Sequence, residues 1–122
     1  MVRSNQAAVA AMAPGAAANA ADVAARQVVT EAGYEEYAHA AGHPVGFYTH
    51  EIGPLPGPDW PDRYGAAVFR TLEAGQIYAI EPSAGFDQDG ERINTGLEEE
   101  VLVTESGAEY LSTLQRELVL IK

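Results

Sequence analysis

Three short segments of the sequence each place an ionisable side chain at a bend or at the end of a strand-like run. They are residues 41–46 with His43, residues 80–82 with Glu81, and residues 96–101 with three successive glutamates. An imidazole and carboxylates are ligands that manganese, iron, cobalt and zinc ions take in proteins. The spacing alone leaves two interpretations open, a metal site or three solvated turns, because these residue types are common at protein surfaces.

The composition of the chain narrows its partners and its chemistry. Eighteen acidic and seven basic residues give a formal net charge of -11. Such a charge repels phosphate backbones and anionic lipid headgroups, so we predict neither nucleic acid nor a membrane surface as a partner. The chain has no cysteine, which excludes disulfides, thiolate zinc sites and cysteine nucleophiles. A bound metal ion must therefore be held by oxygen and imidazole ligands.

The alanine-rich start of the chain resembles a targeting segment only in part. Residues 18–20, Ala-Asn-Ala, have the small-x-small form of a signal-peptidase site. Asn5, Gln6 and the break at Pro14 interrupt the preceding stretch, and alanine is only weakly apolar. No run approaches the roughly 20 apolar residues that cross a bilayer. We therefore predict a cytoplasmic protein.

The length of 122 residues and the hydrophobic content of 47% predict one domain, residues 1–122, with a modest core. Its first part favours helices. A helix over residues 5–12 would stop before Pro14-Gly15. A second helix over residues 19–32 would begin with Asn19 as its cap and stop at Gly33.

From Tyr34 onward, short apolar runs are bounded by turn-forming residues, a pattern that favours strands. It predicts a hairpin turn around residues 86–91 and strands over residues 45–50, 76–81, 97–104 and 118–121. Four prolines and a tryptophan between residues 53 and 63 predict a surface loop or lid.

Several segments resemble motifs of the pita-bread metallopeptidases, the family of methionine aminopeptidase, aminopeptidase P and prolidase. Residues 42–51, GHPVGFYTHE, are similar to that family's GHGIG…HE segment, including the seven-residue spacing of the two histidines. Residues 75–82, GQIYAIEP, and residues 97–107, LEEEVLVTESG, resemble its GMVFTIEP and RIEDTVLVTEDG strands. Upstream, residues 13–15 and 26–34 resemble the helices before the first histidine motif. The resemblance covers nearly the whole chain, with its parts in the family's order.

Carried over residue by residue, the resemblance implies that His43, Glu81 and Glu98 are metal ligands. It also gives Glu81 the role of general base and His50 that of a catalytic, substrate-binding group beside the scissile amide. His39 matches a further histidine of the proline-specific members and is expected to bind substrate or to support the site. The cofactor would be a divalent ion, manganese, cobalt, zinc or iron.

The implied fold is α+β, half of a pita-bread fold, in which two N-terminal helices pack on a curved, mainly antiparallel sheet. The implied activity is metal-dependent hydrolysis of an N-terminal peptide bond. The proline-specific members, Xaa-Pro aminopeptidases and dipeptidases, are the closer match because Gly53-Pro54 follows the second histidine motif as it does in them. The substrate would therefore be a peptide.

The sequence departs from the family pattern in two ways. Pro44 stands where many members have glycine. The family also draws two aspartate ligands from a hairpin that precedes the helices, and no such pair is found here, since Asp22 lies on a predicted helix. The chain is thus expected to be the C-terminal portion of the catalytic domain, to bind at most one ion, weakly, and to pair as a homodimer or with a separate N-terminal half that covers its sheet edge.

Three alternatives stay open. The first is a non-catalytic remnant or peptide-binding module that keeps the fold, because fold alone does not settle activity. The second is a truncated piece of a longer product. The third is a resemblance to the metal-independent creatinase type, in which a histidine acts as the base, although the retention of Glu81 and Glu98 favours metal binding.

Overall fold

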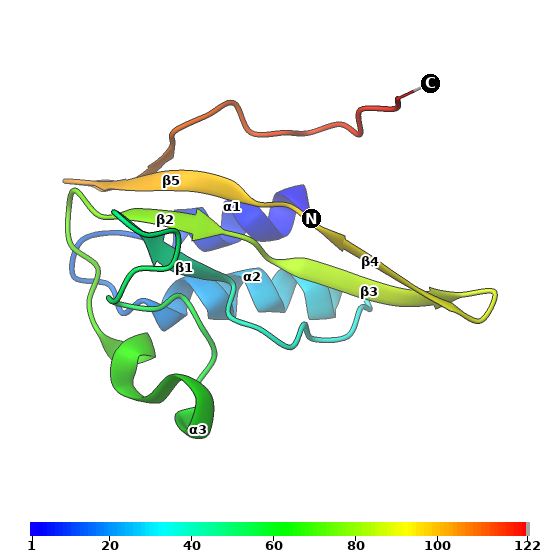
Figure 1. Ribbon diagram of the computed structural model, residues 1–122, viewed down its shortest axis with the longest axis horizontal. Coiled ribbons are helices and arrows are strands. Elements are labelled where there is room, and N and C mark those ends of the chain that lie inside the picture. Colours follow the sequence, from blue (N-terminus) through cyan, green and yellow to red (C-terminus); the bar gives the residue numbers. More distant parts are fainter. Residues whose placement is uncertain (122) are drawn as a thin grey trace.

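A computed structural model describes residues 1–121 and shows two helices behind an antiparallel sheet, with a hairpin arm reaching away from it (Figure 1). Helix α1 spans Val2–Ala10 and helix α2 spans Asn19–Glu31. Both predicted helices are confirmed. The cap prediction is wrong: α2 begins at Asn19 itself, Ala18 occupies the cap position, and no side chain caps the helix. Gly33 ends the helix as predicted, with a φ of 86° that favours glycine.

Within the described chain, four strands form the main sheet in the order β1-β2-β5-β6, with every neighbouring pair antiparallel. Their bounds are β1 Gly42–Val45, β2 Ile77–Ile80, β5 Glu99–Thr104 and β6 Gly107–Tyr110. The strands expected over residues 76–81 and 97–104 are confirmed as β2 and β5. These observations agree with the α+β fold that the sequence predicts.

Two strand predictions are wrong, for different reasons. Residues 46–50 do not continue β1, because the chain turns back: the Gly46 amide donates to the Tyr48 carbonyl at 3.1 Å, and the Glu51 amide donates to the Pro44 carbonyl at 3.0 Å. Residues 118–121 form no strand in the described structure and leave Ile121 97% exposed. The place beside β5 is taken by β6, which the sequence reading missed.

The remaining strands, β3 Ser83–Gln88 and β4 Glu91–Gly96, form the hairpin arm seen on the right of Figure 1. Asp89 and Gly90 make its turn with φ values of 52° and 81°. Positive φ at both central residues is the signature of a type I′ turn, which matches the twist of paired strands. The turn predicted around residues 86–91 is confirmed.

The proline-rich segment is not a surface lid. Pro54, Pro56 and Pro58 are buried, and the Pro56 carbonyl accepts a hydrogen bond from the Gly42 amide of β1 at 3.1 Å. The segment leads into the short helix α3, Pro61–Tyr64, and the 3-10 helix η1, Gly65–Phe69. Proline composition predicted an extended chain correctly but says nothing of its burial, which depends on packing against β1.

The core lies between the helices and one face of the sheet. Small residues on the helices, such as Ala8 and Ala25, are fully buried, and the sheet supplies larger side chains. The largest buried apolar contributions come from Met12, Leu72, Tyr78, Ile80, Val101 and Val103. Since β2 turns Tyr78 and Ile80 toward the helices, and β5 turns Val101 and Val103 the same way, the alternate residues of both strands face away from the core. Among residues 1–121, no helix combines the length and apolar character needed to cross a bilayer.

Candidate metal centre

The sheet register brings the predicted metal ligands together. Ile80 is the last paired residue of β2. It lies opposite Gly42 of β1 on one side and opposite Glu99 of β5 on the other. Pairing continues one step further, since the Glu81 amide donates to the Ala41 carbonyl at 2.7 Å. On the β5 side, the same register sets Glu81 opposite Glu98. Because side chains alternate between faces, Glu81 and Glu98 project from the face opposite the core.

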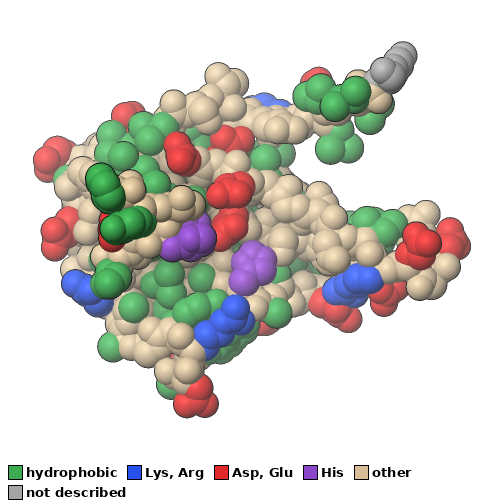
Figure 2. Space-filling view, in the orientation of Figure 1, with side chains coloured by type: hydrophobic (Ala, Val, Ile, Leu, Met, Phe, Trp, Pro, Cys, Tyr) green, Lys and Arg blue, Asp and Glu red, His purple; other side chains and the backbone are tan. Residues whose placement is uncertain are grey.

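His43, Glu81 and Glu98 form one cluster on that face. Each offers a ligand atom, and these atoms lie within 4.8 Å of one another. Nε2 of His43 lies 3.7 Å from Oε1 of Glu81. His43 is buried, Glu81 is half-buried and Glu98 is exposed, so the cluster opens to solvent on one side. Figure 2 shows histidine surface beside a patch of acidic surface in the middle of this face.

The hydrogen bonds of His43 suit a metal ligand. Its Nδ1 lies 3.2 Å from the Pro44 carbonyl oxygen. A carbonyl only accepts, so the neutral ring carries its proton on Nδ1, and Nε2 turns a lone pair toward the carboxylates. Tying the other ring nitrogen to a carbonyl in this way is the common arrangement for a metal-binding histidine.

The donor set of the cluster fits a divalent cation. One imidazole lone pair and two carboxylates face one another, which places three electron-rich groups in one small space. In the part of the chain that the structure describes, no lysine or arginine pairs with Glu81 or Glu98. A cation that accepts nitrogen and oxygen ligands would neutralise this arrangement.

His50 lies beside the cluster but is not part of it. Its ring centroid is 4.1 Å from that of His43, with 33° between the ring planes. The turn after β1 folds the chain back and so brings the second histidine of the motif over the first. His50 is exposed. It can therefore donate or accept a hydrogen bond at the open side of the cluster.

His39 contacts Ser83, two residues after Glu81, and has both ring nitrogens engaged. Nδ1 lies 2.7 Å from the Ala40 carbonyl oxygen, and Nε2 lies 2.8 Å from Oγ of Ser83. The carbonyl fixes the proton on Nδ1, so the Ser83 hydroxyl donates to Nε2. Ser83 lies in no motif that the sequence shows.

A buried ion pair on α2 fixes the segment that leads into β1. Arg26 donates to both carboxylate oxygens of Asp22 at 2.9 Å, to the Tyr37 carbonyl at 2.7 Å and to the His39 carbonyl at 3.0 Å. Asp22 also accepts from the Ala41 amide at 2.9 Å. Burial raises the pKa of the Asp22 carboxyl, while Arg26 and the Ala41 amide oppose that rise. An Asp and an Arg four residues apart on the buried side of a helix was the available signal in the sequence.

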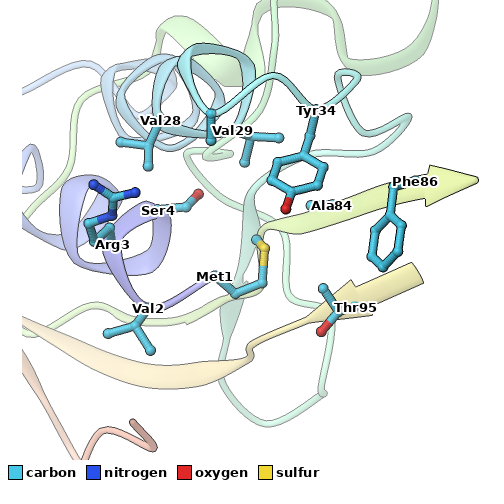
Figure 3. Close-up of a pocket in the computed structure, with 11 residues that line it drawn as sticks. Met1, Val2, Arg3, Ser4, Val28, Val29, Tyr34, Ala84, Phe86 and Thr95 are labelled. Atoms are coloured by element: carbon cyan, nitrogen blue, oxygen red, sulfur yellow. The ribbon is translucent and has the colours of Figure 1, made fainter. Parts of the chain in front are cut away.

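A mostly apolar hollow lies apart from the cluster. It has a volume of about 360 Å³ and opens between the start of α1, the end of α2 and the hairpin arm (Figure 3). Met1, Val28, Tyr34 and Phe86 are among its walls. The described residues that line it do not include the three candidate ligands. Its walls among residues 1–121 are mostly apolar and include no histidine or carboxylate.

A helix-backed antiparallel sheet with a histidine and two glutamates on its open face is the arrangement of a pita-bread metallopeptidase. Residues 1–105 match the model of "Metallopeptidase family M24", and the chain belongs to this family. It is 36% identical over 115 residues to an Xaa-Pro dipeptidase of Pyrococcus furiosus. The matched region covers 92% of this chain and 29% of that protein.

Solved structures agree with the fold. The dipeptidase PepE of Mycobacterium ulcerans is similar with a TM-score of 0.78 and 34% sequence identity over 96% of this chain and 29% of that one. A recombinant prolidase of Thermococcus sibiricus is similar with a TM-score of 0.75 and 27% identity over 94% of this chain and 28% of that one. The chain thus spans less than a third of the length of the relatives it matches.

Proposed function

We propose that this chain carries the histidine and two glutamate ligands of a metal-dependent peptidase that hydrolyses the N-terminal peptide bond of Xaa-Pro substrates. The observation that supports it most is the convergence of His43, Glu81 and Glu98, whose ligand atoms lie within 4.8 Å of one another. The relatives named above include an Xaa-Pro dipeptidase and a prolidase. These names give the class of peptide bond to test.

In this proposal His43 binds the ion through Nε2, and Glu81 and Glu98 bind it through carboxylate oxygens. Manganese, cobalt, zinc and iron accept this mixture of ligands. Three protein ligands leave further positions open, so the chain by itself would hold one ion at most, and weakly. A bound divalent ion supplies Lewis acidity, which polarises a carbonyl and makes water more acidic.

The chain's own residues would supply the remaining chemistry. Glu81, half-buried and directly after β2, would accept a proton at a carboxylate oxygen. His50, exposed and with its ring centroid 4.1 Å from that of His43, would hydrogen-bond the amide of a substrate. His39 would act on the substrate side of the cluster together with Ser83, whose hydroxyl occupies its Nε2.

We further propose that residues 1–122 act as one domain, corresponding to the C-terminal portion of a pita-bread catalytic domain. The partner would be a peptide, with a second copy of this chain or a separate N-terminal half completing the assembly. The net charge of -11 supports neither nucleic acid nor an anionic membrane as a partner.

Calorimetric titration with Mn²⁺, Co²⁺ and Zn²⁺ tests the metal-binding part. Glu98→Gln keeps the size of the side chain and removes its charge, and Glu105→Gln makes the same change on an exposed residue outside the cluster. We expect saturable binding near one ion per chain in the wild type and in Glu105→Gln, and its loss in Glu98→Gln. Equal binding by all three proteins, or none by the wild type, would contradict the proposal.

Hydrolysis of Xaa-Pro dipeptides and of matched dipeptides without proline tests the catalytic part. The oligomeric state is measured on the same sample. Turnover that requires the metal and is lost in Glu81→Gln supports a peptidase. Metal or peptide binding without turnover under any of these conditions supports the second candidate, a pita-bread module that binds peptide without catalysis.

A further inference from the structure

Asn5 of α1 is a fully buried polar residue that contacts both glutamate-bearing segments of the cluster. Its exposed fraction is 0%. The side-chain amide Nδ2 donates to the Ile80 carbonyl at 2.7 Å and to the Leu97 carbonyl at 3.3 Å. Ile80 directly precedes Glu81, and Leu97 directly precedes Glu98. One amide group therefore bridges the peptide units next to two of the three candidate ligands.

The bridge lies at the junction between two paired segments that share one register. Ile80 and Glu99 are the last pair of β2 and β5, and Ser83 and Gly96 are the first pair of β3 and β4. At this junction the Leu97 amide donates to the Pro82 carbonyl at 3.3 Å, but Pro82 has no N–H to return a bond to the Leu97 carbonyl. Asn5 supplies a donor to that carbonyl and to the Ile80 carbonyl, and so stabilises the junction where the carboxylates must stay together.

The chemistry of the site suits asparagine. Its amide group has two N–H donors and one acceptor on a short stem. Both donors face carbonyls, and the acceptor Oδ1 receives the hydroxyl of Tyr110, on β6, at 2.9 Å. Aspartate would offer no donor in its ionised form, and leucine would fill the space without any polar contact. Every polar atom of the buried side chain is thus satisfied, as a stable buried network requires.

We propose that Asn5 is a positioning residue of the metal centre. By tying the peptide units before Glu81 and Glu98 to each other, it keeps the two carboxylates at a separation that one ion can bridge. The expected effect on metal affinity rests on the proposed metal site. The expected effect on the two strand ends rests only on the hydrogen bonds of Asn5. Residues that orient metal ligands typically contribute about 10- to 100-fold in metal affinity.

The test compares Asn5→Leu with Tyr110→Phe. Asn5→Leu removes both bonds to the carbonyls at nearly constant volume. Tyr110→Phe removes only the bond to Oδ1 and leaves the bridge in place, so it is the matched control. If Asn5→Leu does not fold, Asn5→Ala is measured in the same way, because its smaller side chain admits water to the freed carbonyls.

Two readouts are taken from each protein. The first is amide hydrogen exchange without metal at Glu81 and Leu97, compared with Tyr78 and Val101 in the middle of β2 and β5. We expect the first two amides to exchange about 10-fold faster in Asn5→Leu, with the second two changed much less, and no such local change in Tyr110→Phe. The second readout is the Mn²⁺ dissociation constant, expected to rise about 10- to 100-fold in Asn5→Leu only.

The outcomes separate the bridge from the metal site. Equal acceleration of all four amides, or none, would overturn the positioning role, because it would leave Asn5 as a general packing residue. Faster local exchange with an unchanged Mn²⁺ dissociation constant would overturn its link to the metal centre. If the wild-type protein binds no Mn²⁺, the proposed function fails, and the exchange measurement still decides whether Asn5 holds the two strand ends together.

Discussion

Replacing Arg26 by methionine tests the buried ion pair that precedes the site. Both residues of the pair are buried: Arg26 is 8% exposed and Asp22 is 1% exposed. Arg26→Met keeps most of the apolar stem but leaves the Asp22 carboxylate and the Tyr37 and His39 carbonyls without this donor. Breaking one side of a buried ion pair costs about 3–5 kcal/mol. That loss is a large part of the roughly 5–15 kcal/mol that stabilises a typical domain.

The pH dependence of this loss has a definite sign. Burial already raises the pKa of the Asp22 carboxyl above its ordinary value of 3.8, and the loss of Arg26 removes a group that opposes the rise. A carboxyl with a raised pKa in the folded state contributes stability below its unfolded pKa and loses it as the pH rises through the folded value. The deficit of Arg26→Met should therefore be smaller at pH 4 than at pH 7.

Urea unfolding at both pH values measures the free energy of unfolding, with Arg116→Met as the control because Arg116 is exposed. The control should stay within about 0.5 kcal/mol of the wild type. Adding Asp22→Asn to Arg26→Met removes the unpaired charge and should recover part of the loss. The reasoning would be refuted if Arg26→Met cost no more than Arg116→Met, or if the double variant were less stable than Arg26→Met.

Three further changes test other parts of the structure. A methyl group in Gly42→Ala would press on the Ala79 carbonyl oxygen, so thermal unfolding should show a loss of about 1–3 kcal/mol, and an unchanged midpoint would contradict the close approach. Burial raises the pKa of Tyr78 from 10.0 to about 12. The free energy of unfolding should therefore fall by about 2–3 kcal/mol as the pH rises from 10 through 12. Urea unfolding should show a weaker fall in Tyr78→Phe, and an equal fall in both proteins would contradict the role of Tyr78. Ser83→Ala should shift the imidazole nitrogen resonances of His39, and Ser83→Thr should restore them; identical spectra for all three proteins would mean that the hydroxyl does not hold the ring.

The sequence was sufficient to predict the helices, two central strands and the hairpin turn, because these depend on local patterns. Gly33 and Asp89-Gly90 sit where positive φ is needed, and the apolar alternation in β2 is continuous. The prediction of a strand over residues 45–50 is wrong because the chain makes a turn there. Hydrogen bonds from Gly46 and Glu51 fold the chain back, and nothing in the apolar pair Phe47-Tyr48 signals this turn.

The candidate ligands were found from their motifs, whereas the residues that hold them were not. His43, Glu81 and Glu98 belong to short recognisable segments, and the register of β1, β2 and β5 brings them together. Asn5 and its two carbonyl partners are 75 and 92 residues apart in the sequence. No periodicity links positions at such separations. Their pairing follows from how α1 packs against the sheet.

The proline-rich segment is a similar case of tertiary packing. Its composition predicted an irregular extended chain, which is correct, and a surface position, which is wrong. The hydrogen bond from Gly42 to Pro56 and the burial of the neighbouring prolines place it along β1. It supports the strand that carries His43 instead of covering the site.

A crystal structure of the chain grown with Zn²⁺, with anomalous diffraction used to locate the ion, tests the metal site most directly. We expect one principal peak at about 2.0–2.2 Å from Nε2 of His43 and from carboxylate oxygens of Glu81 and Glu98. A principal peak at other carboxylates, or no peak at this cluster under saturating zinc, would contradict the claim that these three residues form a metal site.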